Sequence, residues 1–173
     1  VKTDPGNKRL IATGTLGDLA AGTCVELEGD YRDDPRYGQQ FTVESWSEMM
    51  PVSVKGIERY LASGRIKGVG KASAKAIVNT FGKDTIEILD NHIDRIAEVP
   101  GLGKKRIEQI KAGWQRHTEM RQMLIGLQGY GISAAYASRI YKAYGADSLY
   151  NINSNPYRLA EDIDGIGSVS YTH

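Results

Sequence analysis

The sequence predicts an α+β chain that is mainly α-helical, with a small β-barrel or β-sheet domain followed by a duplicated helical domain. Three observations support this fold class. Apolar and polar residues alternate within residues 8–48, apolar residues take helical spacing from Ser53 onward, and the helical part contains an internal repeat. Alternation with a period of two indicates half-buried strands, whereas spacings of three and four indicate helices.

The β domain is assigned to residues 1–52. Val25, Leu27 and Tyr31 alternate with acidic residues, and a similar alternation returns at residues 40–44. The segment 33–38 between them contains a proline, which presets φ, and a glycine, which tolerates positive φ. We therefore expect a hairpin there.

The helical part repeats itself when the sequence is shifted by 63 positions. Ile77 then falls on Ile140, and the aromatic-glycine pair Phe81-Gly82 falls on Tyr144-Gly145. The repeat predicts two copies of one unit, each with short hairpins between helices. We assign residues 53–128 to the first unit and residues 129–173 to the second, which is partly degenerate and truncated.

Two turns of the form Gly-apolar-Gly carry the functional argument. Each is followed at once by a predicted helix, whose first backbone N–H groups lack partners within the helix and lie at the positive end of its dipole. Such a helix start suits a phosphate oxygen, glycine lets the ligand approach the main chain, and the neighbouring lysines add positive charge. The predicted phosphate-binding residues are Lys67, Gly68, Val69, Gly70, Lys71, Lys75, Gly101, Leu102, Gly103, Lys104, Lys105 and Arg106.

The hairpins of the second unit have weaker binding chemistry. In the first of them Tyr130, Ser133 and Ala134 replace the two lysines and the second glycine of the first unit, so we expect it to pack without binding DNA. The second keeps its glycines as Gly165-Ile166-Gly167 but follows acidic residues, and we expect at most weak binding there.

The charge distribution also favours the hairpins of the first helical unit over those of the second as the binding site. Residues 56–121 hold 13 Lys/Arg against 8 Asp/Glu, a net charge of +5, whereas residues 1–55 hold 6 against 9. Residues 122–173 hold 3 against 4. A polyanion is therefore expected to bind the middle of the chain.

No motif for catalysis or metal binding is present in the sequence. Gly70-Lys71 and Gly103-Lys104 both lack the first glycine and the hydroxyl residue that an ATP-binding phosphate loop requires. His92 and His117 have no neighbouring ligands and are predicted to be surface residues, and the lone Cys24 is predicted to be a small buried side chain. This chain is therefore predicted to be neither an enzyme nor a cofactor-binding protein, and no metal-ligating side chains are predicted. A low-affinity monovalent cation at the carbonyl groups of a hairpin stays an open alternative.

The aromatic residues are expected to serve mainly in packing. Tyr136, Tyr141 and Tyr144 have helical spacing and are assigned to the core. Trp46, Tyr31 and Tyr37 in the β domain are better placed to stack on single-stranded DNA. That domain is net acidic, however, which favours a structural or partner-docking role. The sequence has no apolar run of about 18 residues and no signal peptide, so a cytoplasmic location and no membrane contact are expected.

The two Gly-apolar-Gly segments resemble the helix-hairpin-helix motif of DNA repair and recombination proteins. Read as a whole, the chain resembles the N-terminal region of the RecD-like ATP-dependent DNA helicases, relatives of the exodeoxyribonuclease V alpha subunit. The blocks that carry this resemblance lie at residues 37–41, 60–70, 155–159 and 165–167. The residues 168–171 depart from the family pattern.

The resemblance implies an OB-like β-barrel, then tandem helix-hairpin-helix units, then a helicase core that unwinds DNA 5′ to 3′ using ATP and Mg²⁺. We therefore expect a piece of a longer protein, whose partners are single-stranded or duplex DNA and the C-terminal helicase domains of the same protein. The expected role is sequence-independent DNA binding in recombination and repair. The alternative is a protein-interaction or scaffolding module in which the hairpins are only structural turns.

Overall fold

The structure is a computed structural model that describes residues 1–3, 6, 8–14, 16, 19 and 21–158. It divides into two compact units, Val1–His117 and Thr118–His173, and each is considered by itself. The predicted division after residue 128 falls near the end of the helix α4 (Lys104–Gly129), whereas the two compact units meet inside that helix.

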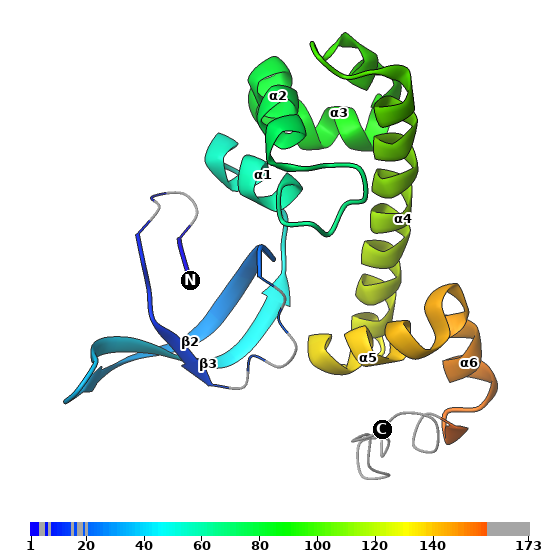
Figure 1. Cartoon of the computed structure of the whole chain (residues 1–173). Coiled ribbons are helices and arrows are strands. Elements are labelled where there is room, and N and C mark those ends of the chain that lie inside the picture. The colour runs from blue at the N-terminus through cyan, green and yellow to red at the C-terminus, as the bar shows by residue number, and fades with distance from the viewer. Residues whose placement is uncertain (4–5, 7, 15, 17–18, 20, 159–173) are drawn as a thin grey trace. The chain divides into compact units, whose positions relative to one another are not determined.

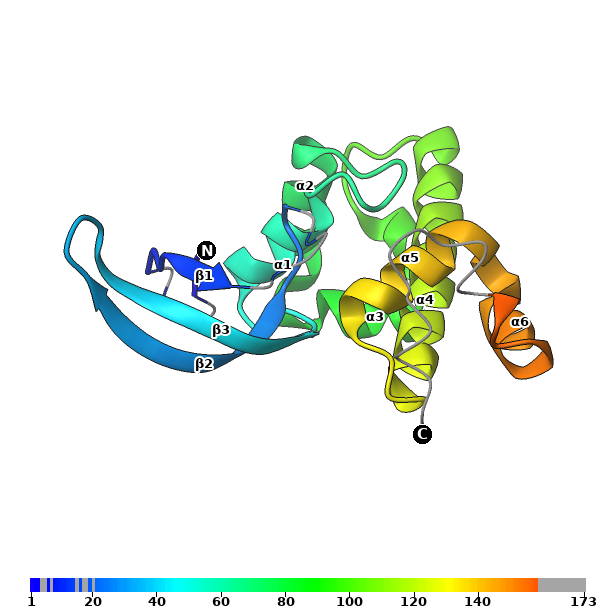
Figure 2. The same cartoon turned by 90° about the horizontal axis from the view of Figure 1, so that it is seen from below.

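The β part of the first unit is a three-stranded sheet in the order β1-β3-β2 (Figure 2). The strands are β1 (Ala12–Gly14), β2 (Val25–Asp34) and β3 (Gly38–Glu48), and β1 runs parallel to β3. The predicted hairpin joins β2 to β3. Its turn is held by the Asp34 carboxylate, which accepts hydrogen bonds from the backbone N–H groups of Arg36 and Tyr37 at 2.8 and 2.9 Å.

The predicted alternation holds at the start of β2, where Val25 and Leu27 are half-buried and their acidic neighbours are exposed. It fails at Tyr31, which is 59% exposed although its ring touches the Phe41 ring edge to face at 5.1 Å. Cys24 is half-buried rather than buried, so that prediction is only partly right. In the described residues the sheet supplies one buried hydrophobic side chain, Val43, because most of its surface faces solvent.

The helical part of the first unit follows directly (Figure 1). It contains α1 (Val54–Leu61), α2 (Lys71–Phe81), the 3₁₀ turn η1 (Gly82–Asp84), α3 (Thr85–Asn91), the 3₁₀ helix η2 (Ile93–Glu98) and the start of α4. The Ser53 hydroxyl begins α1 by accepting the Gly56 N–H at 3.0 Å, as expected of an N-cap serine.

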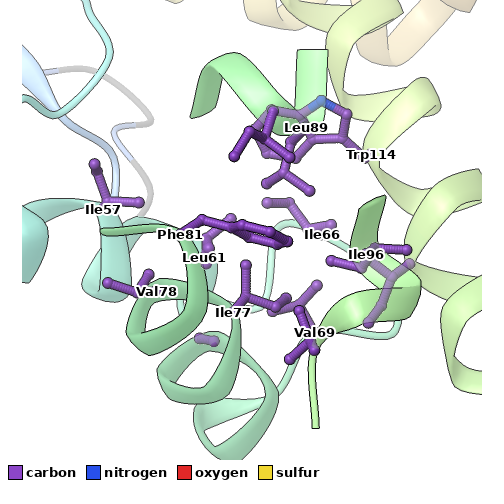
Figure 3. Close-up of a cluster of buried hydrophobic side chains, with 14 of the residues drawn as sticks. Ile57, Leu61, Ile66, Val69, Ile77, Val78, Phe81, Leu89, Ile96 and Trp114 are labelled. Carbon is purple, nitrogen blue, oxygen red and sulfur yellow. The ribbon is translucent and has the colours of Figure 1, made fainter. Parts of the chain in front are cut away.

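One hydrophobic core joins all of these helices (Figure 3). Its buried members come from α1, α2, α3, η2 and α4 and from the two hairpins, so the hairpins between the helices are anchored in the same core. The side chains labelled in Figure 3 are Ile57, Leu61, Ile66, Val69, Ile77, Val78, Phe81, Leu89, Ile96 and Trp114.

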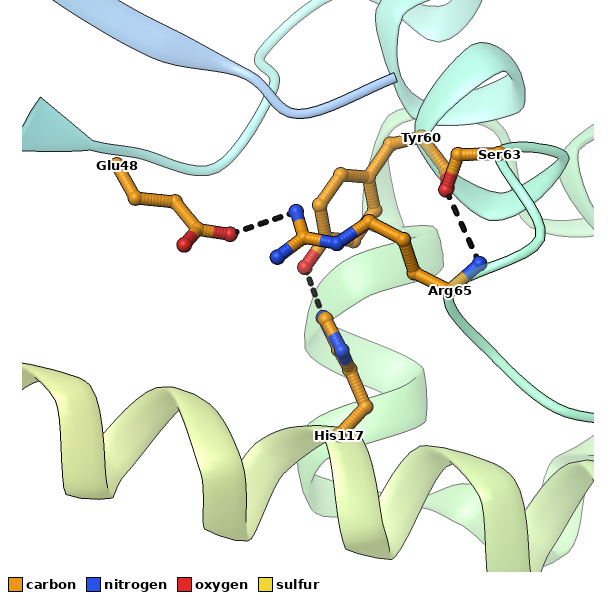
Figure 4. A network of polar contacts seen from close by, with 5 residues as sticks. All are labelled: Glu48, Tyr60, Ser63, Arg65 and His117. Carbon is orange, nitrogen blue, oxygen red and sulfur yellow. Dashed lines mark hydrogen bonds and ion pairs between the residues drawn. The ribbon is translucent and has the colours of Figure 1, made fainter. Parts of the chain in front are cut away.

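The prediction that His117 is a surface residue is wrong, since its side chain is only 3% exposed. His117 lies one turn after Trp114 on the inner face of α4, and its Nε2 atom is hydrogen-bonded to the hydroxyl of the buried Tyr60 (Figure 4). That bond compensates for taking a polar ring out of water. His92 is exposed, as predicted.

A partly buried ion pair connects the end of β3 to the segment that leads into the first hairpin. The Arg65 guanidinium lies 2.8 Å from the Glu48 carboxylate, and the two side chains are 16% and 18% exposed (Figure 4). The Ser63 hydroxyl, which donates to the Tyr60 carbonyl at 2.7 Å, braces the same turn. The entry to the first hairpin is therefore held by polar contacts as well as by the core.

The second unit contains the end of α4, then α5 (Ala134–Tyr144), η3 (Gly145–Asp147) and α6 (Ser148–Ser154). Leu127, Ala137, Ile140 and Ile152 form its core. The predicted packing role of the tyrosines is confirmed for Tyr136 and Tyr144, which pack against that core.

The structure reproduces the 63-residue repeat in detail. Helices α2 and α5 have equal lengths and end at Gly82 and Gly145, with φ of 58° and 57° and ψ of −131° at both. The hydroxyls of Thr85 and Ser148 then donate to the carbonyls of those same glycines, each at 2.6 Å. The remainder of the repeat, which contains Gly165-Ile166-Gly167, lies outside the described residues.

Candidate nucleic-acid interface

The first hairpin is a tight turn that ends where α2 begins. Gly68 has a φ of +91°, which only glycine adopts readily, and Val69 is buried in the core. Gly70 is the N-cap residue of α2, and its carbonyl accepts the first helical hydrogen bond from the Ala74 N–H at 2.9 Å. No side chain caps the start of this helix. The first amides of α2 are therefore open toward solvent.

The second hairpin repeats this geometry 33 residues later. Gly101 has a φ of +82°, Leu102 packs against the core, and the Gly103 carbonyl accepts the Ile107 N–H of α4 at 3.0 Å. The element before it is the six-residue η2 rather than an α-helix. Two helices of the first unit thus begin directly after a second glycine.

The fold explains the first glycine of each hairpin but not the second. A Cβ atom built at Gly70 or Gly103 would meet no atom within 4 Å, and the φ of −95° at Gly70 is open to any residue. The space that a side chain would take at these two residues is therefore open. Glycine there is what a ligand would require if it approached the backbone closely.

The first hairpin packs against α4. A Cβ atom at Gly68 would lie 3.0 Å from the Gln109 Cβ, and one at Gly113 would strike the backbone of Lys67. In addition, the Arg106 guanidinium reaches the Gly68 carbonyl at 3.5 Å. Since α4 itself starts at the second hairpin, the two hairpins belong to one packed assembly. A surface hollow beside them is lined by Gly103, Lys105, Arg106 and Gln109.

The contact at Gly113 is a feature that the sequence analysis missed. An isolated glycine in the interior of a long helix costs about 1 kcal/mol against alanine, so it signals a packing or functional reason. That signal was present at Gly113, but only the structure shows that the partner is the first hairpin.

The lysines of the two hairpins retain their charge for an external partner. Those at positions 67, 71, 75, 104 and 105 are exposed, and in the part of the chain that the structure describes none of them forms an ion pair.

Two other cations of the first unit are paired with carboxylates of the same unit. Lys111 donates to Asp94 at 2.7 Å, which holds the pKa of that carboxyl below its usual value, and Arg95 pairs with Glu98 at 3.1 Å. Five lysines without an ion pair in the described residues thus lie beside the two helix starts.

The corresponding hairpin of the second unit closes its own helix start. Gly131 keeps the turn, with a φ of +79°, but Ser133 replaces the second glycine, and its hydroxyl accepts the Tyr136 N–H at 3.4 Å. A phosphate would have to compete with that cap. That the second unit's first hairpin packs without binding DNA stays a prediction.

The described residues hold neither a cluster of metal-ligating side chains nor a helix that could span a membrane. They contain no group of three His, Cys, Asp or Glu side chains placed to hold a metal ion. None of the helices among them is both long and apolar enough to cross a membrane.

Comparison with known proteins accounts for nearly the whole chain. Residues 1–51 match the family model described as the OB-fold domain of the ATP-dependent DNA helicase YrrC, and residues 58–116 match the SAM-like helix-hairpin-helix tandem. Residues 116–170 match the helix-hairpin-helix domain of the ATP-dependent RecD2 DNA helicase.

A curated relative agrees with the family models. The chain is 31% identical over 157 residues to the ATP-dependent RecD2 DNA helicase of Deinococcus radiodurans. The match covers 89% of this chain and 22% of that protein, so the chain spans about a fifth of its relative's length. Domain by domain, the chain is thus similar to the OB-fold and helix-hairpin-helix region of the RecD-like DNA helicases.

Proposed function

We propose that this chain binds DNA through its backbone phosphates, without regard to sequence, as the accessory region of an ATP-dependent 5′ to 3′ DNA helicase in recombination or repair. The ATP, the Mg²⁺ and the motor that uses them would belong to the part of the helicase that the chain does not span. The protein would act in the cytoplasm, on single-stranded or duplex DNA.

The empty space in front of Gly70 and Gly103 is the observation that carries this proposal. A hairpin that only connected packed helices would tolerate a side chain there, as Ser133 shows in the second unit. Two retained glycines beside open helix amides are what a phosphate oxygen would require. Contacts of this kind position the backbone and carry no sequence information.

The alternative function is a protein-interaction module. It is favoured by the exposed rings of Tyr31 and Tyr37 on the net-acidic β part, which are 59% and 67% exposed. In that case the hairpins would be structural turns. The two functions differ in what they predict for hairpin variants.

The first test reverses the hairpin charges. Lys71→Glu/Lys104→Glu should lower the affinity for a fluorescent duplex and for a matching single strand at least tenfold at low salt, because two phosphate contacts are lost. The salt dependence should also become shallower, by roughly 0.9 units of log K per log salt for each lost contact. Fluorescence anisotropy across a salt series measures both quantities. Duplexes of unrelated sequence should behave alike.

The matched control reverses two lysines away from the hairpins. Lys55→Glu/Lys83→Glu changes the net charge equally, and Lys83 lies past the other end of α2 from Lys71. It should lose much less affinity. Equal losses in the two double variants would indicate general charge attraction, and no loss in either would leave the hairpins as structural turns.

A second test fills the empty space without changing charge. Gly70→Ser/Gly103→Ser gives both hairpins the residue found at position 133, and a serine N-cap exceeds glycine by only a few tenths of a kcal/mol. Thermal stability should be unchanged or slightly higher, whereas DNA affinity should fall several-fold. Unchanged affinity would show that no ligand approaches these glycines.

A further inference from the structure

The first hairpin of the second unit differs from its counterpart in what it presents to solvent. Its helix start is closed by Ser133, and Tyr130 occupies the position that Lys67 holds in the first unit. The Tyr130 side chain is 58% exposed. A positively charged tip has thus been replaced by an aromatic ring.

The backbone beneath this ring is fixed. The Tyr130 N–H donates to the Leu127 carbonyl at 3.1 Å, the Gly131 N–H donates to the Gln128 carbonyl at 2.9 Å, and Ile132 packs against the core. A tyrosine has only two side-chain torsions to order when it binds, so a ring on an anchored turn binds at low entropic cost.

The repeat indicates that this position faces outward in a complete unit. In the first unit the backbone of Lys67 is packed against Gly113 of α4, yet its side chain remains exposed. Tyr130 has the same place relative to the turn glycine and to the helix that follows. A ring there would face the same kind of ligand that Lys67 faces.

We propose that Tyr130 binds an unpaired base of single-stranded DNA by stacking, while the first unit holds phosphates. The proposal rests on the function proposed above, and it replaces the expectation that this hairpin packs without binding DNA. Stacking suits this unit because residues 122–173 hold 3 Lys/Arg against 4 Asp/Glu, which offers phosphates little attraction. Base stacking on an aromatic ring needs no net charge and tolerates any base.

The test compares a single strand with one that carries abasic sites in place of its bases, using the whole 173-residue chain. Tyr130→Ala should weaken binding to the normal strand about tenfold, in line with the loss of one stacked base. It should leave binding to the abasic strand unchanged. The salt dependence should not change, because no phosphate contact is lost. Tyr130→Phe should behave like the wild type.

The control is Tyr150→Ala. Tyr150 is 72% exposed on α6, but its counterpart in the first unit is the acidic Glu87, so it should have no effect. The proposal is overturned if Tyr130→Ala binds the normal strand as tightly as the wild type, if it loses equal affinity for both strands, or if the wild type does not bind single strands. Failure of the phosphate proposal is separate, since it would appear as insensitivity to Lys71→Glu/Lys104→Glu.

Discussion

Replacing Ile140 by alanine is expected to unfold most of the second unit while the first unit stays folded. Ile140 is fully buried and is one of four buried hydrophobic residues in the described core of that unit. Removing its methyl and methylene groups costs about 2–5 kcal/mol. A unit of this size has only about 3–8 kcal/mol of stability in total, so the loss is a large fraction.

Hydrogen exchange measured by mass spectrometry would separate the two units. In Ile140→Ala, amides of α5 and α6 should lose protection, whereas those of α2 and α3 should keep it. The equivalent variant Ile77→Ala, at a fully buried position of the first unit, should show the reverse pattern. Loss of protection throughout the chain in both variants would mean that the two units fold as one.

The Ile140→Ala variant also tests which unit makes the proposed phosphate contacts. If phosphate contacts come from the first unit, Ile140→Ala should retain the salt dependence of DNA binding. A salt slope that collapsed together with the second unit would assign the phosphate contacts to residues after His117.

Gly113→Ala is expected to destabilise the first unit, although alanine is the better helix former. Helix propensity alone would favour alanine by about 1 kcal/mol. A Cβ atom at this position, however, would lie 3.1 Å from the backbone N and C atoms of Lys67 and closer still to the carbonyl oxygen. Backbone cannot rotate away as a side chain can, so we expect overpacking to prevail, with a net loss of about 1–3 kcal/mol.

Relief of that clash would move the first hairpin away from α4, so DNA affinity should fall together with stability. Thermal unfolding and anisotropy on one preparation measure both effects. Gly129→Ala is the control, because Gly129 lies in the same helix and its Cβ would meet nothing within 4 Å. If both variants were equally stabilised, the close approach of Lys67 to α4 would not exist in solution.

Much of the local structure was predictable from the sequence. The hairpin at residues 33–38, both Gly-apolar-Gly turns and the repeat all depend on neighbouring residues, whose spacing and turn chemistry can be read directly. The aromatic-glycine ends of α2 and α5 are nearly identical in geometry, as their sequences predict.

The errors concern contacts between residues far apart in the chain. His117 was assigned to the surface because it has no neighbouring ligand, but its partner Tyr60 lies 57 positions away. The role of Gly113 depends in the same way on Lys67. The strand β1 also has no strong pattern of its own, since its three residues owe their place to pairing with β3. Local spacing carries no information about such partners.

The serine cap at position 133 also bears on how a duplicated protein can diverge. A change between glycine and serine at a helix start alters stability by only a few tenths of a kcal/mol, yet it decides whether the amides behind it are available. If the hairpins bind phosphate as proposed, one copy of a repeated unit can lose or regain that binding through a single codon, with the fold left intact. Selection could tune how many hairpins hold DNA without passing through an unstable intermediate.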